Sequence, residues 1–167
     1  MKTVVIGGGP SGMMAAISAA SCGDTVILLE KENKLGQKLL ITGKGRCNIT
    51  SSLPMSEFIN NIPGNGKFLF SCFKEFTNQD IIDLLEKHGL KVKLERGNRI
   101  FPVTDMAQSV LDCFIKELKD QKVEIKTNCE VVEIKTQNDE IVGIYTNNGE
   151  LVNCSKVILA TRWKELS

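Results

Sequence analysis

The opening of the chain alternates short apolar runs with one longer helical pattern. Residues 3–6 and 25–29 are continuous runs of apolar and β-branched side chains, which predict two buried strands. Residues 10–22 between them are rich in Ala, Met and Ser and are followed by Gly23, which predicts a helix that ends there. A strand, a helix and a second strand in this order predict a parallel sheet with a right-handed crossover.

A different pattern occupies residues 51–103, which we interpret as an inserted α+β segment. Its predicted elements are helices over residues 67–76 and 79–88 and a hairpin of residues 91–95 and 98–101. Four phenylalanines have near-helical spacing and are predicted to lie in the core or to contact a lid: Phe68, Phe70, Phe73 and Phe76.

Residues 104–161 return to a sheet-forming pattern. Thr104 or Asp105 can cap a helix over residues 105–120, whose apolar stripe consists of Val110, Leu111, Phe114 and Leu118. After it we predict a strand at 123–126, an antiparallel meander at 131–135, 141–146 and 151–154, and a central parallel strand at 157–160.

These elements predict the α/β class and a Rossmann-like fold: a parallel sheet with an antiparallel β-meander crossover and a small α+β insertion. Residues 1–50 form the first part of the main domain, residues 51–103 the insertion, and residues 104–161 the remainder of the main domain, followed by a tail at 162–167.

Composition excludes several classes of protein. The 21 Lys and Arg residues nearly balance the 20 Asp and Glu, so the net charge is +1 and no nucleic-acid partner is expected. No run approaches the roughly 18 apolar residues of a membrane span, so no membrane partner is expected either.

The six cysteines form no C-x-x-C pair and are not at metal-ligand spacing from His88, the one histidine, so we predict no metal site and a reduced, cytoplasmic protein. His88 is assigned to the end of a helix rather than to catalysis.

A glycine-rich turn carries the first chemical signal. The pattern Gly7-x-Gly9-x-x-Gly12 stands between the first strand and the first helix, and Glu30 ends the second strand. Glycines let a diphosphate approach the backbone at a helix N-terminus, and a carboxylate can accept the hydroxyl protons of a ribose. Glu30 would repel a 2′-phosphate. This turn predicts a dinucleotide site that includes Gly7, Gly9, Pro10, Ser11, Gly12 and Glu30.

Basic side chains dominate the next segment. Only Glu32 opposes its cations, which predicts an anionic neighbour, although a solvated charged loop is the alternative; the cations are Lys31, Lys34, Lys38, Lys44 and Arg46. Cys47 has no cysteine partner a few residues away, so a packing role is favoured over redox chemistry. Cys22 and Cys113 are interpreted as small core residues.

Two stretches resemble a known family. Residues 4–30, with Ala16 and Gly23 at the expected offsets, resemble the FAD-type dinucleotide fingerprint. The run Gly36-Gln37-Lys38-Leu39-Leu40-Ile41-Thr42-Gly43-Lys44-Gly45-Arg46-Cys47-Asn48-Ile49-Thr50 resembles the signature of the BaiN-like, aminoacetone-oxidase-like bacterial flavoproteins, which are NAD(P)/FAD-dependent oxidoreductases. Residues 99–103 are similar to a second motif of that family.

The resemblance implies that FAD lies extended over the sheet. It places Glu30 on the adenosine ribose, residues 9–12 at the pyrophosphate and the backbone of Val131 beside the adenine. It also implies a loop that reaches toward the flavin, so the predicted cofactor residues further include Lys31, Gly36, Lys38, Thr42, Gly43, Gly45, Arg46, Cys47 and Asn48. NAD(P)H is a candidate electron donor, and a small molecule is the expected substrate of the intact protein.

The predicted function is the N-terminal FAD-binding portion of a flavin-dependent oxidoreductase that transfers hydride through flavin N5. No catalytic acid or base is assigned. Residues 162–167 depart from the family pattern, so we interpret the chain as truncated and as weakly active or inactive. Two alternatives stay open: a non-catalytic nucleotide-binding remnant or interaction module, and an NAD-binding dehydrogenase domain.

Overall fold

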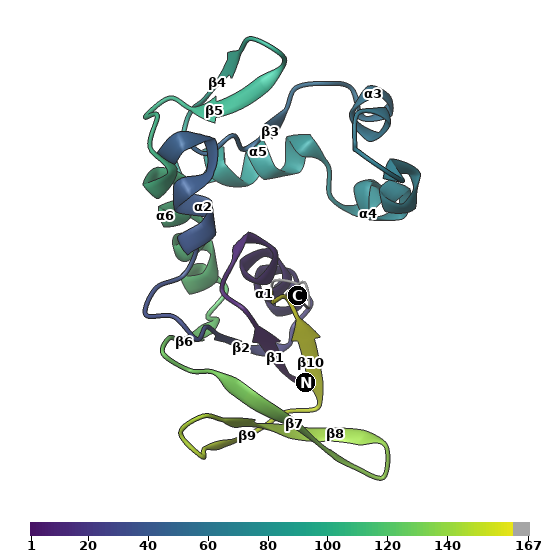
Figure 1. Cartoon of the computed structure of the whole chain (residues 1–167), viewed down its shortest axis with the longest axis vertical. Helices are drawn as coiled ribbons and strands as arrows, with labels where there is room; N and C mark the ends of the chain where they lie inside the picture. The colour runs from purple at the N-terminus through teal and green to yellow at the C-terminus, as the bar shows by residue number, and fades with distance from the viewer. Residues whose placement is uncertain (162–167) are drawn as a thin grey trace, which may run out of the picture. The chain divides into compact units, whose positions relative to one another are not determined.

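The computed structural model describes residues 1–161, which fall into two compact units. We call Met1–Leu39 together with the described chain from Phe114 onward the Rossmann unit, and Leu40–Cys113 the inserted unit. Figure 1 shows the elements of both units along the chain.

A four-stranded parallel sheet forms the centre of the Rossmann unit, in the order β10-β1-β2-β6. In the register of this sheet Val5 pairs with Leu28 on one side and with Ile158 on the other. The parallel sheet predicted from the opening strand, helix and strand is therefore confirmed. The four strands are β1 (Lys2–Ile6), β2 (Thr25–Leu29), β6 (Glu124–Lys126) and β10 (Lys156–Leu159).

The two faces of this sheet are covered by different elements. Helix α1 (Pro10–Ser21) packs on one face, and the antiparallel meander lies on the other (Figure 1). Successive side chains of a strand point to opposite faces, so the residues of β1 and β2 divide between the two layers. As predicted, the meander is antiparallel, and it consists of β7 (Val131–Gln137), β8 (Glu140–Thr146) and β9 (Leu151–Asn153).

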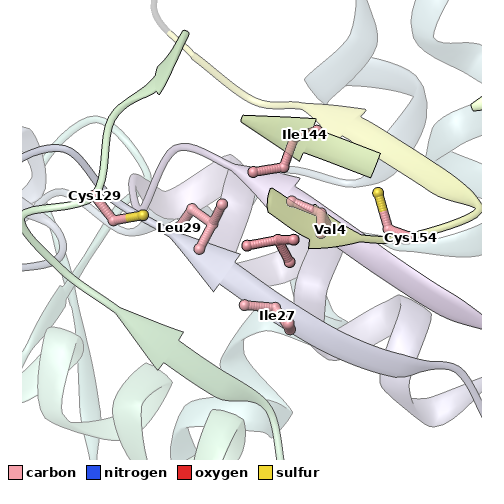
Figure 2. Packing of buried hydrophobic residues seen from close by; sticks show 7 residues of the cluster. Val4, Ile27, Leu29, Cys129, Ile144 and Cys154 are labelled. Carbon is pink, nitrogen blue, oxygen red and sulfur yellow. The ribbon is translucent and has the colours of Figure 1, made fainter. Parts of the chain in front are cut away.

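A buried apolar cluster joins the meander to the sheet (Figure 2). Val4, Ile27 and Leu29 come from β1 and β2, and Ile144 comes from β8. Both Val4 and Ile144 are fully buried. The other members of the cluster are Cys129, Val152 and Cys154.

Helix α6 (Ala107–Asp120) runs from the inserted unit into the Rossmann unit. All four residues of its predicted apolar stripe are buried, between 0% and 4% exposed, which confirms the interpretation of the stripe. The helix begins at Ala107, so Asp105 lies outside it with a left-handed φ of 54°. The prediction that Asp105 could cap the helix is wrong, because its carboxylate binds Arg46 and Lys93.

The inserted unit combines short helices with a three-stranded antiparallel sheet in the order β3-β5-β4. The predicted hairpin is confirmed, and a short third strand pairs with it; the strands are β3 (Thr50–Ser51), β4 (Val92–Glu95) and β5 (Arg99–Pro102). The helical elements are α2 (Gln37–Ile41), which starts in the Rossmann unit, the 3₁₀ turn η1 (Thr42–Gly45), α3 (Met55–Asn60), the 3₁₀ turn η2 (Gly66–Leu69), α4 (Phe70–Glu75) and α5 (Asn78–Lys87).

Four side chains that the sequence placed in the core are exposed, so the core interpretation is wrong for Phe68, Phe70, Phe76 and Cys22, while a contact of the phenylalanines with a lid stays a prediction. The side chains of Phe68, Phe70 and Phe76 are 79%, 53% and 36% exposed, because the predicted helix over 67–76 divides into η2 and α4 and loses its single apolar face. Phe73 does pack, against Phe58 with the ring centroids 5.4 Å apart. Cys22, at the end of α1, is exposed, whereas Cys113 is buried as predicted.

Strand β10 lies at an edge of the sheet in the described chain, so the prediction of a central strand is wrong although its parallel pairing is right. The predicted atypical tail at 162–167 lies outside the described residues. No helix within residues 1–161 combines the length and apolar character that crossing a membrane requires.

Candidate functional site

The turn between β1 and α1 needs glycine at two positions for reasons of backbone packing. Gly7 has φ of 109°, and its amide donates to the carbonyl of Leu29 at 2.8 Å. A Cβ on Gly7 would lie 2.8 Å from the carbonyl oxygen of Ala160, and one on Gly12 would lie 1.7 Å from the carbonyl oxygen of Gly7. These two glycines therefore hold the turn against the start of the helix and the end of β10.

Gly9 differs from the other glycines of the turn, because a Cβ built on it would meet no atom within 4 Å. It is the N-cap of α1, where no side chain caps the helix and no acidic residue occupies the first turn. Pro10 is the first helical residue, and Ser11 beside it is exposed. Open space beside a glycine at an uncapped helix N-terminus is the environment that a diphosphate needs, so these residues fit that part of a dinucleotide.

Glu30 follows directly after β2, and its carboxylate is tied to the turn. Oε2 accepts a hydrogen bond from the Gly8 amide at 2.7 Å, and Oε1 accepts one from the Glu32 amide at 2.9 Å. The Glu30 backbone is also fixed, since its amide donates to Lys126 and its carbonyl accepts from Cys129, both at 2.9 Å. Each carboxylate oxygen keeps a further lone pair, so the oriented side chain can accept two hydroxyl protons.

Gly8 belongs to this site, although the spacing of the glycine pattern alone does not single it out. A Cβ at Gly8 would lie 2.3 Å from Cδ2 of Leu35 and 3.0 Å from Oε2 of Glu30. Its carbonyl accepts the amide of Gly36 at 2.9 Å, which attaches the following segment to the turn. Three consecutive glycines where the pattern needs only two are the sequence signal for this residue.

The predicted residues of the following segment divide by burial. Gly36 is buried and has φ of 68°, which only glycine adopts freely, so its place in the site follows from the backbone. Lys31 and Lys38 are exposed in the Rossmann unit. They supply positive charge close in sequence to Glu30 and Gly36.

Val131 starts β7 and lines a groove of about 220 Å³. The groove also contains Ile6, the last residue of β1, so it lies at the carboxyl end of the parallel sheet, where open α/β sheets bind ligands. Its lining is mostly apolar, which suits the face of an aromatic base. The other lining residues are Val132, Glu133, Ile134, Leu159 and Thr161.

The remaining predicted residues, Thr42 to Asn48, belong to the inserted unit. Their loop is compact, since the amide of Arg46 donates to the carbonyl of Gly43 at 3.3 Å and the amide of Cys47 donates to that of Thr42 at 3.0 Å. A Cβ on Gly43 would lie 3.0 Å from the amide nitrogen of Asn48, so the two ends of the loop approach closely. Gly45 has φ of 86°.

Glu95 and Asp105 neutralise Arg46, whereas the local sequence offered only Glu32 as an acid in this basic segment. Its guanidinium donates to Asp105, at 2.8 Å from Nε and 2.6 Å from Nη2, and to Glu95 through Nη2. These acids lie 49 and 59 residues away along the chain, so a local charge count could not include them. The pKa values of Glu95 and Asp105 are held below their usual range mainly by hydrogen bonds, from Arg46 and Lys93 respectively.

Cys47 is 6% exposed, and burial raises the pKa of its thiol. A buried, protonated thiol is a poor nucleophile, which supports a packing role for this residue rather than a redox role. Cys47 also has a left-handed φ of 60°, so the loop forces an unusual backbone conformation on a residue with a side chain.

The predicted site residues thus fall into two groups. The Rossmann unit brings together the glycine-rich turn, Glu30 and Gly36 through backbone and carboxylate hydrogen bonds. The inserted unit holds the loop of residues 42–48 on its own sheet. The two groups belong to different compact units of the structure.

This fold and this site define a Rossmann-type nucleotide-binding protein. The chain belongs to the family described as HI0933-like protein Rossmann domain, which matches residues 1–164. Among curated relatives, the 3-dehydro-bile acid delta(4,6)-reductase of Clostridium scindens is 37% identical over 159 residues, which cover 93% of this chain and 37% of that protein. The ribosomal RNA dihydrouridine synthase of Escherichia coli is 31% identical, covering 95% of this chain and 38% of that protein.

A solved structure shares the fold at low identity. The 3-ketosteroid-delta4-(5alpha)-dehydrogenase of Rhodococcus jostii aligns with a TM-score of 0.66 and 15% identity, covering 94% of this chain and 44% of the other. The chain therefore spans less than half the length of these relatives and of this structure.

Proposed function

We propose that this chain is the FAD-binding part of a flavin-dependent oxidoreductase. The single observation that carries the proposal is the Glu30 carboxylate, hydrogen-bonded at 2.7 Å to the turn where Gly9 leaves open space at an uncapped helix N-terminus. A carboxylate for a ribose and an anion-binding turn, held at a fixed spacing, are the two contacts that an adenosine diphosphate group requires.

FAD, when bound, supplies a ring that accepts and donates hydride, and the residues of this chain bind and orient it. Amides at the start of α1 would hold the diphosphate, and Glu30 would accept the ribose hydroxyls. The apolar groove at Val131 would take the adenine, in line with the resemblance to flavoproteins in the sequence. Within the inserted unit, residues 42–48 would offer a ligand their backbone rather than the guanidinium of Arg46, because Arg46 is paired with Glu95 and Asp105.

The substrate and location of the intact protein are also part of the proposal. The names of the curated relatives include a bile acid reductase and a ribosomal RNA dihydrouridine synthase, so relatives with similar sequences differ in substrate class. The near-neutral charge of this chain favours a small molecule over RNA, with NAD(P)H as electron donor. Six free cysteines favour the cytoplasm.

The test is the absorbance of the purified chain before and after incubation with FAD and gel filtration. We expect a flavin spectrum that co-elutes with the protein and is bleached by a reductant. A colourless chain that retains no FAD would refute the proposal. Protection from thermal unfolding by NADH and not by FAD would instead favour the NAD-binding dehydrogenase alternative.

A further inference from the structure

Two cations and two carboxylates form a compact network beside the loop of residues 42–48. Arg46 donates to Glu95 and to Asp105, the latter at 2.6 Å from Nη2. Lys93 completes the network, with its Nζ 2.5 Å from Oδ2 of Asp105 and 3.5 Å from Oε1 of Glu95. The four side chains carry no net charge together, so the network does not attract an anion.

The guanidinium of Arg46 stacks on a ring through its planar face and also donates hydrogen bonds through its N–H groups. Its Cζ lies 4.3 Å from the centroid of the Phe101 ring, and Phe101 is only 4% exposed. Phe101 belongs to β5, and Glu95 belongs to the paired strand β4. A guanidinium stacked on a buried ring and bonded to two carboxylates is fixed to the small sheet of the inserted unit.

The loop that contains Arg46 has an unusual backbone. Gly43 and Gly45 have φ of 56° and 86°, which glycine adopts readily, but Lys44 and Cys47 have φ of 58° and 60°. Left-handed backbone at residues with side chains is strained, and it persists only where the surroundings fix it. Arg46 lies between these two residues and anchors the segment to the sheet.

We propose that Arg46 is a positioning residue, which fixes the backbone shape of residues 42–48 on the small sheet of the inserted unit and does not itself contact the cofactor. The reference to the cofactor rests on the proposed function, whereas the anchoring of the loop is independent of it. This role differs from the one that the resemblance implies, in which Arg46 is a cofactor contact.

The test compares two ways of breaking the same network. Arg46→Gln removes the guanidinium, and Glu95→Gln combined with Asp105→Asn removes its partners; a third variant carries all three changes. Arg99→Gln is the matched control, because Arg99 lies on the same sheet, 5.8 Å from the Phe101 ring, and its Nε donates only to the carbonyl of Arg96 among the described residues.

Two quantities are measured on each folded variant: hydrogen exchange of peptides covering residues 42–48 without ligand, and the dissociation constant for FAD. We expect exchange to rise about threefold to tenfold in Arg46→Gln and in the acid variant, with no further rise in the triple variant and no change in Arg99→Gln. FAD affinity should weaken in the same pattern. Arg46→Lys, which keeps the charge without the planar fork, should give intermediate values and replaces Arg46→Gln if that variant does not fold.

Two results would overturn the proposal. One is unchanged exchange of the loop in Arg46→Gln. The other is weaker FAD binding in Arg46→Gln while the acid variant binds FAD like the wild type, which would mean that Arg46 touches the cofactor. A wild-type chain that binds no FAD refutes the proposed function, but the exchange data on the unliganded chain still decide whether Arg46 anchors the loop.

Discussion

The carboxylate of Glu30 accepts the amide of Gly8 at 2.7 Å, which joins the end of β2 to the turn that follows β1. The two halves of the proposed nucleotide site, one for the ribose and one for the diphosphate, are therefore parts of one hydrogen-bonded arrangement. A change at either residue should affect the other.

The first prediction concerns Glu30→Ala. Loss of a charge-assisted hydrogen-bond pair to the ribose should weaken FAD binding by about 1–3 kcal/mol, measured by fluorescence titration. Glu32→Ala is the matched control, because the amide of Glu32 and not its side chain contacts Glu30. Equal FAD affinity in Glu30→Ala and the wild type would remove Glu30 from the site.

The second prediction separates two glycines of the same turn. Gly12→Ala should destabilise the protein by about 1–3 kcal/mol or more, because its Cβ would lie 1.7 Å from the carbonyl oxygen of Gly7. Gly9→Ala should lower the thermal midpoint much less than Gly12→Ala, since Gly9 has φ of −76° and open space beside it, but should weaken FAD binding by filling that space. If Gly9→Ala binds FAD normally, the diphosphate does not lie at this position.

The third prediction concerns acid stability. Asp24 accepts a hydrogen bond from Thr3 at 2.6 Å and pairs with Lys156 at 3.0 Å, and chiefly these contacts lower the pKa of Asp24 from 3.8 to about 2. A carboxyl whose pKa is lower in the folded state stabilises the protein above its unfolded pKa, and this contribution is lost as the pH falls from about 4 to about 2. Urea unfolding at several pH values should show wild type more stable than Asp24→Asn at pH 6, with a difference that shrinks in acid. A difference that stays constant with pH would contradict this assignment.

The fourth prediction concerns the thiols. Cys22 and Cys72 are exposed, whereas the other four cysteines are buried. Burial raises the pKa of Cys47, Cys129 and Cys154, so they should remain protonated at neutral pH. A thiol reagent should label two cysteines rapidly in the folded chain and the rest only in urea. Rapid labelling of Cys47 would show that its loop opens, and would restore a redox role for it.

Much of the parallel sheet could be predicted because the residues that specify its strands and the following turn lie close together in the sequence. Residues 3–6 and 25–29 are apolar on both faces, as strands covered on both sides must be, and the glycine-rich turn and Glu30 stand at fixed offsets from them. The stripe of α6 was equally clear, because its period matches one helix face.

The errors arise where distant residues decide the outcome. Asp105 was interpreted, as an alternative to Thr104, as a helix cap because local sequence offers that role, but its partner Arg46 is 59 residues away. The four phenylalanines between residues 68 and 76 have near-helical spacing as a group, yet a 3₁₀ turn precedes α4, and the rings of Phe68 and Phe70 are exposed. Gly8 was overlooked because its role depends on Leu35 and Glu30, which approach it only in the fold.

In the proposed site, α1 and Glu30 together hold an adenosine diphosphate group. Calorimetric titration of the chain with FAD and with riboflavin, which lacks both the diphosphate and the adenosine, tests it directly. We predict binding of one FAD per chain and no measurable binding of riboflavin. Riboflavin binding as tight as that of FAD, or no FAD binding at all, would contradict the account.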